Sequence, residues 1–530
     1  MYMDYGWLAI IPPLVAIVLA FVTKRVLISL FLGVFSGGLI ISGWNPFSGA
    51  AYSLSAIVGS ITDEWNASLL LFNLLMGSGV AFIWRLGGSE ALTTWARKRI
   101  KSRKAAGVGA WLLGIIVFFN DYVNAAIVGN VFRDISEEQK ISSERLSYIL
   151  DSTAAPVATF FISDWIAFQI GMVKAGMDTA GITGISSFQG YLYSIPLNLY
   201  CIFAVLFVGM LVITGRDFGP MLKAEHRAVT EGKIVRDGAK PMLDVNYELG
   251  EPKDTKPMLI TFFLPLIVLV GVTLFGFWFT GGGPEGGSLM DILGASDPAK
   301  ALLWGAFAMT LTGIVMAIST KIMNLAEAMD TFIDGLKLML LACAILVLAW
   351  SLGSITGEMD LAGFIVNSLP QSLPFVFVPV TIFLLGMLIS FATGTSWGTM
   401  TILTPIAIPL AYTLTNDVYL SLAMAGVVFS GAIFGDHCSP ISDTTVLASI
   451  FSGADHIDHV TTQVPYALTA AGVALLMYLL FGLFELTPWI LIPLGVIILF
   501  GLMYVLSNHS RRKYGINPKT KRKIKKAKSN

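Results

Sequence analysis

The stretch FGDHCSPISDTTVLAS, residues 434–449, decides how this chain has to fold. It lies within a long apolar region, yet it holds two aspartates, Asp436 and Asp443, and a proline at position 440. A proline removes a backbone donor and interrupts an α-helix. Irregular backbone at membrane depth is tolerated only where it is buried in protein or lines a water-filled cavity. The stretch therefore predicts a broken helix inside a larger helical assembly.

The composition of the whole chain agrees with a protein embedded in a lipid bilayer. Of the 530 residues, 55% are hydrophobic and 13% are charged, whereas about 25% of a typical soluble protein is charged. This argues against a soluble enzyme, a nucleic-acid-binding protein and a disordered protein. The three cysteines are too widely spaced for a disulfide framework or a metal cluster. No Walker P-loop or dinucleotide fingerprint occurs, so we expect no cofactor and no enzymatic activity.

Long apolar stretches predict about 11 membrane crossings, since about 20 apolar residues span a bilayer. The clearest candidates are 7–23, 26–42, 67–84, 188–214, 257–279, 299–318, 337–356, 463–486 and 488–506. Segments 97–104, 215–256 and 511–530 are rich in Lys and Arg, whereas 43–66, 280–298, 357–372 and 413–418 contain neither. Basic loops face the cytoplasm. We therefore expect an outside N-terminus, a cytoplasmic C-terminus and a bacterial inner-membrane location.

The chain contains an internal repeat. Residues 107–135, GVGAWLLGIIVFFNDYVNAAIVGNVFRDI, precede the stretch SYILDSTAAPVATFFISDW at 147–165; likewise 384–410, LLGMLISFATGTSWGTMTILTPIAIPL, precedes 434–449. Each half thus pairs an interrupted apolar stretch with a helix broken at Asp plus Pro. The basic loops fall on one side only if the first stretch of each pair is a re-entrant hairpin and the halves are inverted. Inverted repeats with broken helices form transport sites near the bilayer midplane.

These patterns predict an all-α polytopic membrane protein of two inverted-topology repeats. The first repeat covers 1–214, with a hairpin at 105–135 and a broken helix at 141–170. A cytoplasmic linker follows at 215–256. The second repeat covers 257–486, with a hairpin at 373–412 and a broken helix at 419–452, and 487–530 adds a span and a basic tail.

Acidic and hydroxyl side chains within the interrupted stretches are the candidate site. An intramembrane ionisable group is costly and marks function by default. Burial raises the pKa of a carboxyl group, so one buried carboxylate can exchange a proton for a cation. Oxygen donors at the hairpin tips suit hard cations, whereas half-helix N-termini favour an anionic group. We predict ion or proton binding by Asp436, Asp443, Asp151, Asp121 and His437, and coordination of cation or substrate by Asn120, Asn124, Ser152, Thr153, Thr395, Ser396, Ser439 and Thr444.

Three histidines lie within or shortly after the run 434–449, and we interpret them separately. His437 is either a proton relay or a polar neighbour of Asp436. His456 and His459 are predicted to lie in an inner loop and to bind no metal.

The run 434–449 resembles the NhaC family of Na⁺/H⁺ antiporters, within the ion transporter superfamily. The stretch SERLSYILDSTAAPVATFFISDW, 143–165, is similar to the other half of that family, and FNDYVNAAIVGN and FATGTSWGTMTILTP resemble the hairpin tips of the superfamily. The resemblance implies exchange of Na⁺ for H⁺ across the bacterial inner membrane, by a mobile transport domain in a homodimer. It carries functional roles to Asp436, His437, Ser439, Asp443, Thr444, Asp151 and Ser152, and more loosely to Asn120, Asp121, Thr395 and Ser396.

An alternative function is coupled transport of a small organic acid or amino acid. Relatives within this family exchange such substrates, and a cavity lined by Thr395, Ser396 and Trp397 beside half-helix N-termini would hold a carboxylate. An ion channel is a third hypothesis, which the paired hairpins disfavour. The expected partners are Na⁺, H⁺, the lipid bilayer and, under the alternative, a carboxylate or amino acid, but no nucleic acid. The basic tail is predicted to be a topological anchor on an anionic leaflet.

Overall fold

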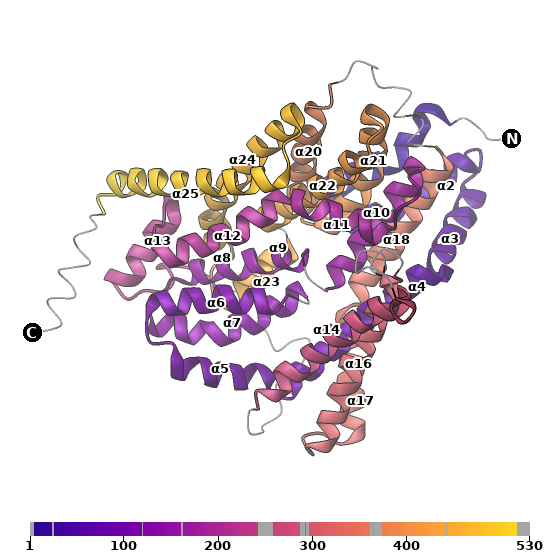
Figure 1. The fold of residues 1–530 in the computed structure, drawn as a ribbon. Coiled ribbons are helices and arrows are strands. Elements are labelled where there is room, and N and C mark those ends of the chain that lie inside the picture. Colours follow the sequence, from indigo (N-terminus) through magenta and orange to yellow (C-terminus); the bar gives the residue numbers. More distant parts are fainter. Residues whose placement is uncertain are drawn as a thin grey trace, which may run out of the picture.

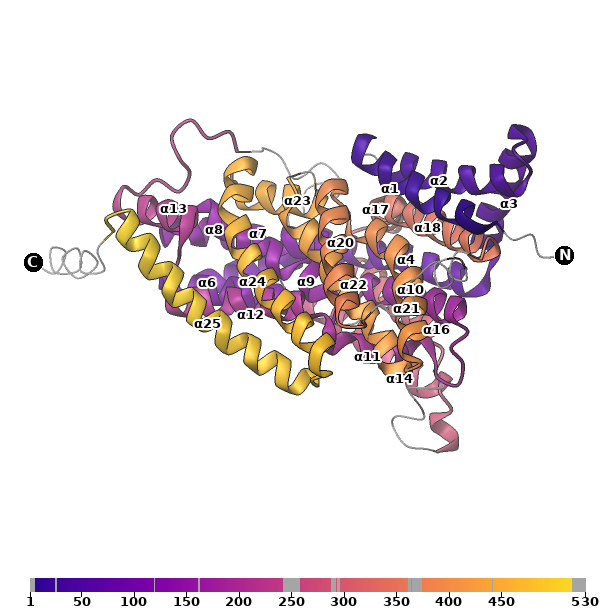
Figure 2. The same cartoon turned by 90° about the horizontal axis from the view of Figure 1, so that it is seen from above.

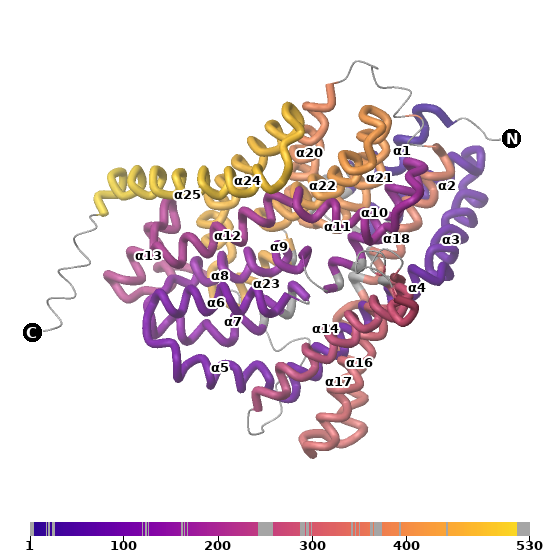
Figure 3. Tube along the Cα trace, in the orientation of Figure 1, coloured from indigo at the N-terminus to yellow at the C-terminus, as the bar shows by residue number. Residues whose placement is uncertain are grey.

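A computed structural model describes residues 5–23, 26–118, 120–160, 163–241, 258–286, 292, 296–360, 364, 374–440 and 442–516 (Figures 1 and 3). These residues form helices joined by turns and short loops, and no β-strand occurs among them. The predicted all-α class is confirmed. The three cysteines, all within this part of the chain, are free.

Eight helices of the described part are long and apolar enough to cross a membrane. They are Glu64–Arg85, Leu199–Thr230, Ile260–Thr280, Ala299–Ser319, Ser396–Thr415, Val418–Cys438, His456–Phe484 and Pro488–Lys513. Shorter apolar helices cover Gly6–Ala16, Leu27–Ile41 and Phe377–Phe391. The chain is a polytopic membrane protein, as expected. The second helix of the predicted re-entrant hairpin, Ser396–Thr415, is itself long enough to cross a membrane.

The first helices form a layer at one end of the molecule. α1 (Ile11–Thr23), α2 (Val26–Ile41) and α3 (Pro46–Thr62) lie beside α18 (Leu340–Glu358), as Figure 2 shows. The prediction of a loop at 43–66 is wrong, because α3 occupies most of it. Its start has the expected local cause: Asn45 caps the helix by accepting from two backbone N–H groups, and Pro46 follows at a position that needs no donor.

A second group of helices extends away from this layer as an arm. α4 (Glu64–Arg85) packs against α16 (Pro298–Ser319) and α17 (Leu325–Leu338), and α16 packs against α14 (Ile260–Thr280). α5 (Gly88–Arg99) connects the arm to the rest of the molecule. Small residues allow the close approach: a Cβ at Gly335 would lie 2.3 Å from the Cα of Ser78. Such contacts are typical of helix packing in membranes.

The remaining helices form the core bundle. They are α6 (Arg103–Ile116), α7 (Asp121–Glu138), α8 (Ser143–Thr153), α9 (Ala155–Ala158), α10 (Asp164–Ala180), α11 (Ser187–Ser194), α12 (Leu199–Thr214), α13 (Gly219–Thr230), α20 (Phe377–Thr393), α21 (Ser396–Thr415), α22 (Val418–Cys438), α23 (Asp443–Ser452), α24 (His456–Phe484) and α25 (Pro488–Lys513). The predicted single span at 188–214 is interrupted, because a 3-10 turn at Ile195–Leu197 separates α11 from α12.

Helices of the two predicted repeats pack against each other reciprocally within the core bundle. The helix after the first break, α10, packs on α21 of the second hairpin, and the helix after the second break, α23, packs on α7 of the first hairpin. α23 also contacts α8, the helix before the first break. This reciprocal arrangement brings both breaks together, although they are nearly 300 residues apart in sequence.

The linker between the repeats carries its own helix, α13, which is packed against the first broken helix. Glu225 of α13 accepts from the Ser142 backbone N–H at 2.9 Å and from Arg145 at 2.7 Å. Arg145 also donates to Asp217 at 2.8 Å, and Asp217 accepts from Tyr466 at 3.1 Å. Residues 242–257 of the linker lie outside the described part. The start of the linker is therefore an ordered part of the bundle.

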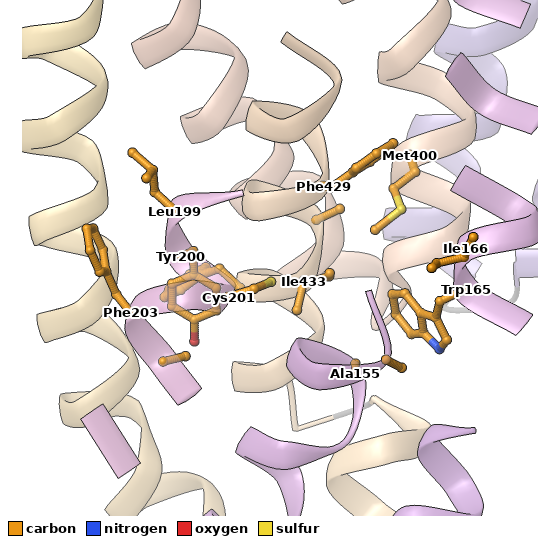
Figure 4. Close-up of a cluster of buried hydrophobic side chains, with 14 of the residues drawn as sticks. Ala155, Trp165, Ile166, Leu199, Tyr200, Cys201, Phe203, Met400, Phe429 and Ile433 are labelled. Atoms are coloured by element: carbon orange, nitrogen blue, oxygen red, sulfur yellow. The ribbon is translucent and has the colours of Figure 1, made fainter. Parts of the chain in front are cut away.

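Apolar side chains fill the space around the two breaks (Figure 4). Ala155 of α9, Ile433 of α22, Cys201 of α12, Trp165 of α10 and Met400 of α21 all belong to this buried cluster. Tyr200 presents its hydroxyl toward the lower part of this view, away from Leu199. The low-dielectric surroundings make each polar group at the breaks costly unless it is bonded.

Candidate functional site

Two interrupted helices meet in the core bundle, and a proline accounts for each interruption. Pro156 has no N–H with which to bond the carbonyl of Ser152, and α8 ends at Thr153, the residue after Ser152. Pro440 likewise cannot bond the carbonyl of Asp436, and α22 ends at position 438. The chain resumes as the short helix α9 and then α10 in the first repeat, and as α23 in the second. Both predicted broken helices are present.

Asp436 is a buried carboxylate in the last turn of α22, with an exposed fraction of 2%. Its Oδ2 accepts from Ser396 Oγ at 2.9 Å, and its Oδ1 accepts from Ser442 Oγ at 2.7 Å. The Ser442 hydroxyl also lies 2.9 Å from Thr444 Oγ1. Because a hydroxyl both donates and accepts, these oxygens can turn lone pairs toward a cation held by the carboxylate. The cluster has the all-oxygen chemistry that hard cations require.

His437 joins the two breaks. Its Nε2 lies 2.8 Å from Ser152 Oγ of α8, and its Nδ1 lies 2.6 Å from the hydroxyl of Tyr200 of α12. A neutral imidazole has one N–H and one lone pair, and a hydroxyl can serve either. Both ring nitrogens are therefore engaged away from the Asp436 carboxylate. This geometry favours the interpretation of His437 as a bridging neighbour.

Asp151 is a second buried carboxylate, with an exposed fraction of 1%. Its Oδ2 accepts from Thr445 Oγ1 at 3.0 Å and from Gln463 Nε2 at 2.6 Å, and His459 Nε2 lies 3.7 Å away. Gln463 Nε2 also donates to the carbonyl of His437. Thr445 Oγ1 lies 3.3 Å from the Asp436 carbonyl, which also accepts from the Ser439 backbone N–H at 3.2 Å. The two aspartates are thus linked through shared donors.

The tip of the first hairpin is fixed to the end of α8 by one amide. Asn124 Nδ2 lies 2.6 Å from the carbonyl of Gly114, 3.0 Å from that of Val117 and 2.9 Å from that of Thr153. A Cβ at Gly114 would lie 2.1 Å from Thr153 Oγ1, so only glycine allows this approach. Asn124 therefore satisfies backbone carbonyls at the hairpin turn and at the helix break together.

The tip of the second hairpin is held against the end of α22 in a similar way. Gly394 ends α20 with a φ of +69°, and Thr395 caps α21 by accepting from the backbone N–H three residues later. Ser439 Oγ donates to the carbonyl of Phe391 at 2.8 Å. A Cβ at Gly435 would lie 2.3 Å from the Phe391 backbone nitrogen. The tip thereby places Ser396 against Asp436.

The remaining predicted residues are near the breaks, with local contacts. Asn120 and Asp121 are buried where α7 begins. The Thr153 hydroxyl donates to the carbonyl of Ile149 at 2.8 Å, a bond within its own helix. Asp443 is the first residue of α23, and its side chain lies outside the described part. The assignment of ion binding to each of these residues stays a prediction.

Sequence reasoning missed five contact residues, namely Ser442, Thr445, Tyr200, His459 and Gln463. The first two lie inside the quoted run 434–449, where the density of hydroxyls was the available signal. The other three come from α12 and α24 and carry no local motif. The predicted inner loop containing His456 and His459 is wrong, because α24 begins at His456 and His459 is completely buried.

Trp397 packs against other aromatic rings. Its ring stacks on Phe168 with centroids 4.4 Å apart and meets Trp165 edge-on at 5.9 Å. A cavity of about 620 Å³ instead lies between α3, α4 and α18 on one side and α10 and α21 on the other; Trp350 and Thr401 are in its wall. Thr395, Ser396 and Trp397 are not part of that wall. The aromatic contacts of Trp397 are thus established, and the cavity expected at the second hairpin tip stays a prediction.

Comparison with known protein families identifies the chain. Residues 157–483 match the family model described as the Na⁺/H⁺ antiporter family. This chain belongs to the Na⁺/H⁺ antiporter family. The match covers the second helix break and begins directly after the first, and it confirms the resemblance inferred from residues 434–449. The protein is accordingly a transporter and not an enzyme.

Two relatives of this antiporter differ in how much of the chain they match. A protein of Haemophilus influenzae, described only as uncharacterized, is 33% identical over 484 residues, which are 89% of this chain and 90% of that protein. The malate-2H(+)/Na(+)-lactate antiporter of Bacillus subtilis is 33% identical over 187 residues, which are 34% of this chain and 37% of that protein. The second match therefore covers only a part of each protein.

The fold of this antiporter also resembles a solved transporter. The YdaH transporter of Alcanivorax borkumensis, whose structure is described as revealing an unusual topology, matches with a TM-score of 0.56. The match covers 82% of this chain and 88% of that one at 14% identity. At this identity the likeness concerns the fold alone.

Proposed function

We propose that this antiporter exchanges Na⁺ for H⁺, with the Asp436 carboxylate as the group that binds Na⁺. The observation that carries the proposal is the carboxylate itself: it is buried at a helix break, and hydroxyls of Ser396 and Ser442 contact its two oxygens. An isolated buried charge is costly unless it is neutralised. A bound cation provides that neutralisation.

The proposal gives the two aspartates different roles. Asp436 is the sodium ligand, because hydroxyl oxygens of the hairpin tip (Ser396) and of the chain after the break (Ser442) can complete its coordination. Asp151 holds the proton that counterbalances the transported sodium, because the groups in contact with its Oδ2 include an amide N–H of Gln463, which has no lone pair to give to a cation. Alternating access then requires that hairpin tips and breaks move together, as their shared contacts favour.

The first experiment is the pH change inside proteoliposomes on addition of NaCl, with KCl as the control and no organic substrate present. We expect a sodium-specific proton movement. Equal responses to both salts, or no response from correctly reconstituted protein, would contradict sodium–proton exchange.

A second candidate function is sodium-coupled exchange of small carboxylic acids, and the partial match to the malate-2H(+)/Na(+)-lactate antiporter favours it. In the present geometry the N-terminus of α21, where a substrate carboxylate would bind, is used by the protein's own Asp436 through Ser396. A screen of malate, lactate and related acids in the same vesicles tests this function. Transport of an acid together with silence in NaCl alone would establish it in place of the first.

We further propose that the chain acts in the bacterial inner membrane with residues 215–256 on the cytoplasmic side, and that it forms a homodimer. Thr230→Cys should resist an impermeant thiol reagent applied outside, because its loop is basic. Reaction of that cysteine from outside would reverse the orientation. Cross-linking in native membranes tests the dimer.

A further inference from the structure

Two histidines at the start of α24 share one serine. Ser449 Oγ of α23 lies 3.0 Å from His456 Nδ1 and 2.8 Å from His459 Nδ1. The outer nitrogens face carbonyl oxygens: His456 Nε2 lies 2.7 Å from the Pro440 carbonyl, and His459 Nε2 lies 2.8 Å from Gln463 Oε1. We name the three residues His456, Ser449 and His459 the His–Ser–His chain.

The neighbours of Gln463 fix how its amide is oriented. Its nitrogen contacts two acceptors, Asp151 Oδ2 and the His437 carbonyl, so that atom must be the NH₂ group. The amide oxygen therefore faces His459, and His459 Nε2 must carry a proton. By the same reasoning the Pro440 carbonyl requires a proton on His456 Nε2.

The Ser449 hydroxyl, which lies between the two Nδ1 atoms, then has one proton too few to serve two neutral rings. With both Nε2 atoms protonated, each neutral ring would present a lone pair at Nδ1 to the Ser449 hydroxyl, which has a single proton to donate. All contacts are satisfied when one ring is doubly protonated and donates to Ser449 while the hydroxyl donates to the other ring. The Thr445 carbonyl, 2.8 Å from Ser449 Oγ, is a third acceptor. If the Ser449 hydroxyl donated to that carbonyl, both rings would have to donate from Nδ1 to Ser449, and both would be cationic. Two like charges in one buried cluster are costly.

The His–Ser–His chain runs from the protein surface to the buried carboxylate. His456 follows Asp455, which is bridged to Pro241 at the end of the described linker segment and accepts from the Lys240 backbone N–H at 2.8 Å. His459 is completely buried, and its Nε2 lies 3.7 Å from Asp151 Oδ2. The chain is therefore a continuous polar route between these two environments.

We propose that the His–Ser–His chain is a proton relay between the face that carries the linker and Asp151. The inference rests on the proposed sodium–proton exchange and names the route of its proton. The Nδ1–H bond of His456 breaks as its proton moves to Ser449 Oγ, and the serine's own proton moves to His459 Nδ1. His459 then gives its Nε2 proton to Asp151, forming a neutral carboxylic acid. A hydronium ion from solvent restores the second proton of His456 and leaves as water, and rotation of the imidazole rings and of the serine hydroxyl returns the chain to its starting arrangement, so that one proton passes inward in each cycle.

Other charged and titratable groups surround the His–Ser–His chain from each neighbouring element. α24 and the residue before it contribute Asp455 and Asp458, which pair with Arg236 of the linker segment. α8 contributes Asp151 and Glu144, the latter paired with Arg227 of α13, and α22 contributes His437. The acidic groups at the surface end favour a cation on His456, and Asp151 favours one on His459.

The test measures efflux of radioactive sodium from proteoliposomes at fixed pH, for the wild type, His456→Gln, Ser449→Ala and the double variant. The control is His509→Gln, an exposed histidine on α25. We expect His456→Gln and Ser449→Ala each to lower the maximal rate about a hundredfold, at the low end for proton-transfer groups, with an unchanged sodium KM. The double variant should lose no more than either single variant, and His509→Gln should behave as wild type.

Increasing concentrations of an impermeant buffer outside separate a relay from a structural role. A small proton donor can replace a surface histidine, so buffer should restore the rate of His456→Gln. Buffer should not restore the rate of Ser449→Ala, because Ser449 is buried and the space left by its hydroxyl is out of reach of the buffer. Wild-type rates in both variants, or a loss in His456→Gln that no buffer concentration changes, would overturn the relay. Absence of sodium-dependent exchange in the wild type itself would instead overturn the proposed function.

Discussion

The two helix breaks of this antiporter have the same origin and different surroundings. Each lies just before a proline, and at each a glycine lets the hairpin approach the broken helix closely. In the first repeat this is Gly114 of the hairpin, against Thr153; in the second it is Gly435 of α22, against Phe391 of α20. At the second break, hydroxyls contact both oxygens of Asp436. At the first break, an amide and a hydroxyl both contact Oδ2 of Asp151, and a histidine lies near it.

This difference supports the proposed division of the exchange between the two breaks. A carboxylate among hydroxyls can bind a cation without losing its surrounding oxygens, since the hydroxyls rotate. A carboxylate held by an amide and next to imidazole is better placed to receive a proton. We therefore assign the cation to the second break and the proton to the first.

The largest expected effect comes from removing the charge at each break in turn. Asp436→Asn should abolish both sodium binding and sodium-driven proton movement, because the neutral amide cannot neutralise a cation. Asp151→Asn should retain sodium binding but uncouple it from protons. Titration of sodium binding at two pH values distinguishes them, with membrane insertion checked for both. Equal loss of sodium binding in the two variants would contradict the division of roles.

A smaller effect is expected from the amide that closes the first break. Asn124→Ala removes the donor facing three carbonyl oxygens and should destabilise the protein by about 2 kcal/mol, since buried acceptors lose their partner. The loss should be visible as a lower temperature of unfolding in detergent, with Asn66→Ala, at a more exposed position on α4, as control. An unchanged temperature would mean that water replaces the amide at the hairpin tip.

The hydroxyls at the second break should tune affinity. Ser442→Ala should weaken sodium binding about tenfold, at the low end for groups that support a bound metal ion, while leaving the maximal rate nearly unchanged. The matched control is Ser421→Ala, a buried serine at the other end of α22 that bonds its own helix. Sodium affinity that falls equally in both variants would remove the special role of Ser442.

The smallest effect concerns Asp455, which caps α24 in front of the His–Ser–His chain. Burial alone would raise its pKa, but backbone N–H groups and Arg236 hold the pKa below its ordinary value of 3.8. A lowered pKa stabilises the fold above pH 3.8, and that contribution is lost as the pH falls through the folded-state pKa. Asp455→Asn keeps the cap and should cost about 0.5 kcal/mol at neutral pH.

Unfolding temperatures of the wild type and Asp455→Asn across pH measure this contribution. The difference between the two proteins should shrink as the pH is lowered below 3.8. A difference that stays constant or grows on acidification would contradict the role of the charge.

The sequence predicted the breaks but not the atoms that join them. Proline next to an intramembrane aspartate is a local signal, and so both breaks could be placed from 151–156 and 436–440. His459 was missed because it precedes the apolar stretch 463–486 that marked the span, and Gln463 because it is a single polar residue at the first position of that stretch. α3 was missed because its serines and glycines lower its hydropathy, although Asn45 and Pro46 are helix-start signals. Contacts between repeats depend on tertiary packing, which no local pattern encodes.

The most direct test of the two-site account counts the protons released when sodium binds to purified protein in weakly buffered detergent. We predict sodium-specific proton release by the wild type, sodium binding without release by Asp151→Asn, and neither by Asp436→Asn. Proton release that persists in Asp151→Asn would contradict the account, because the proton would then belong to the sodium ligand alone.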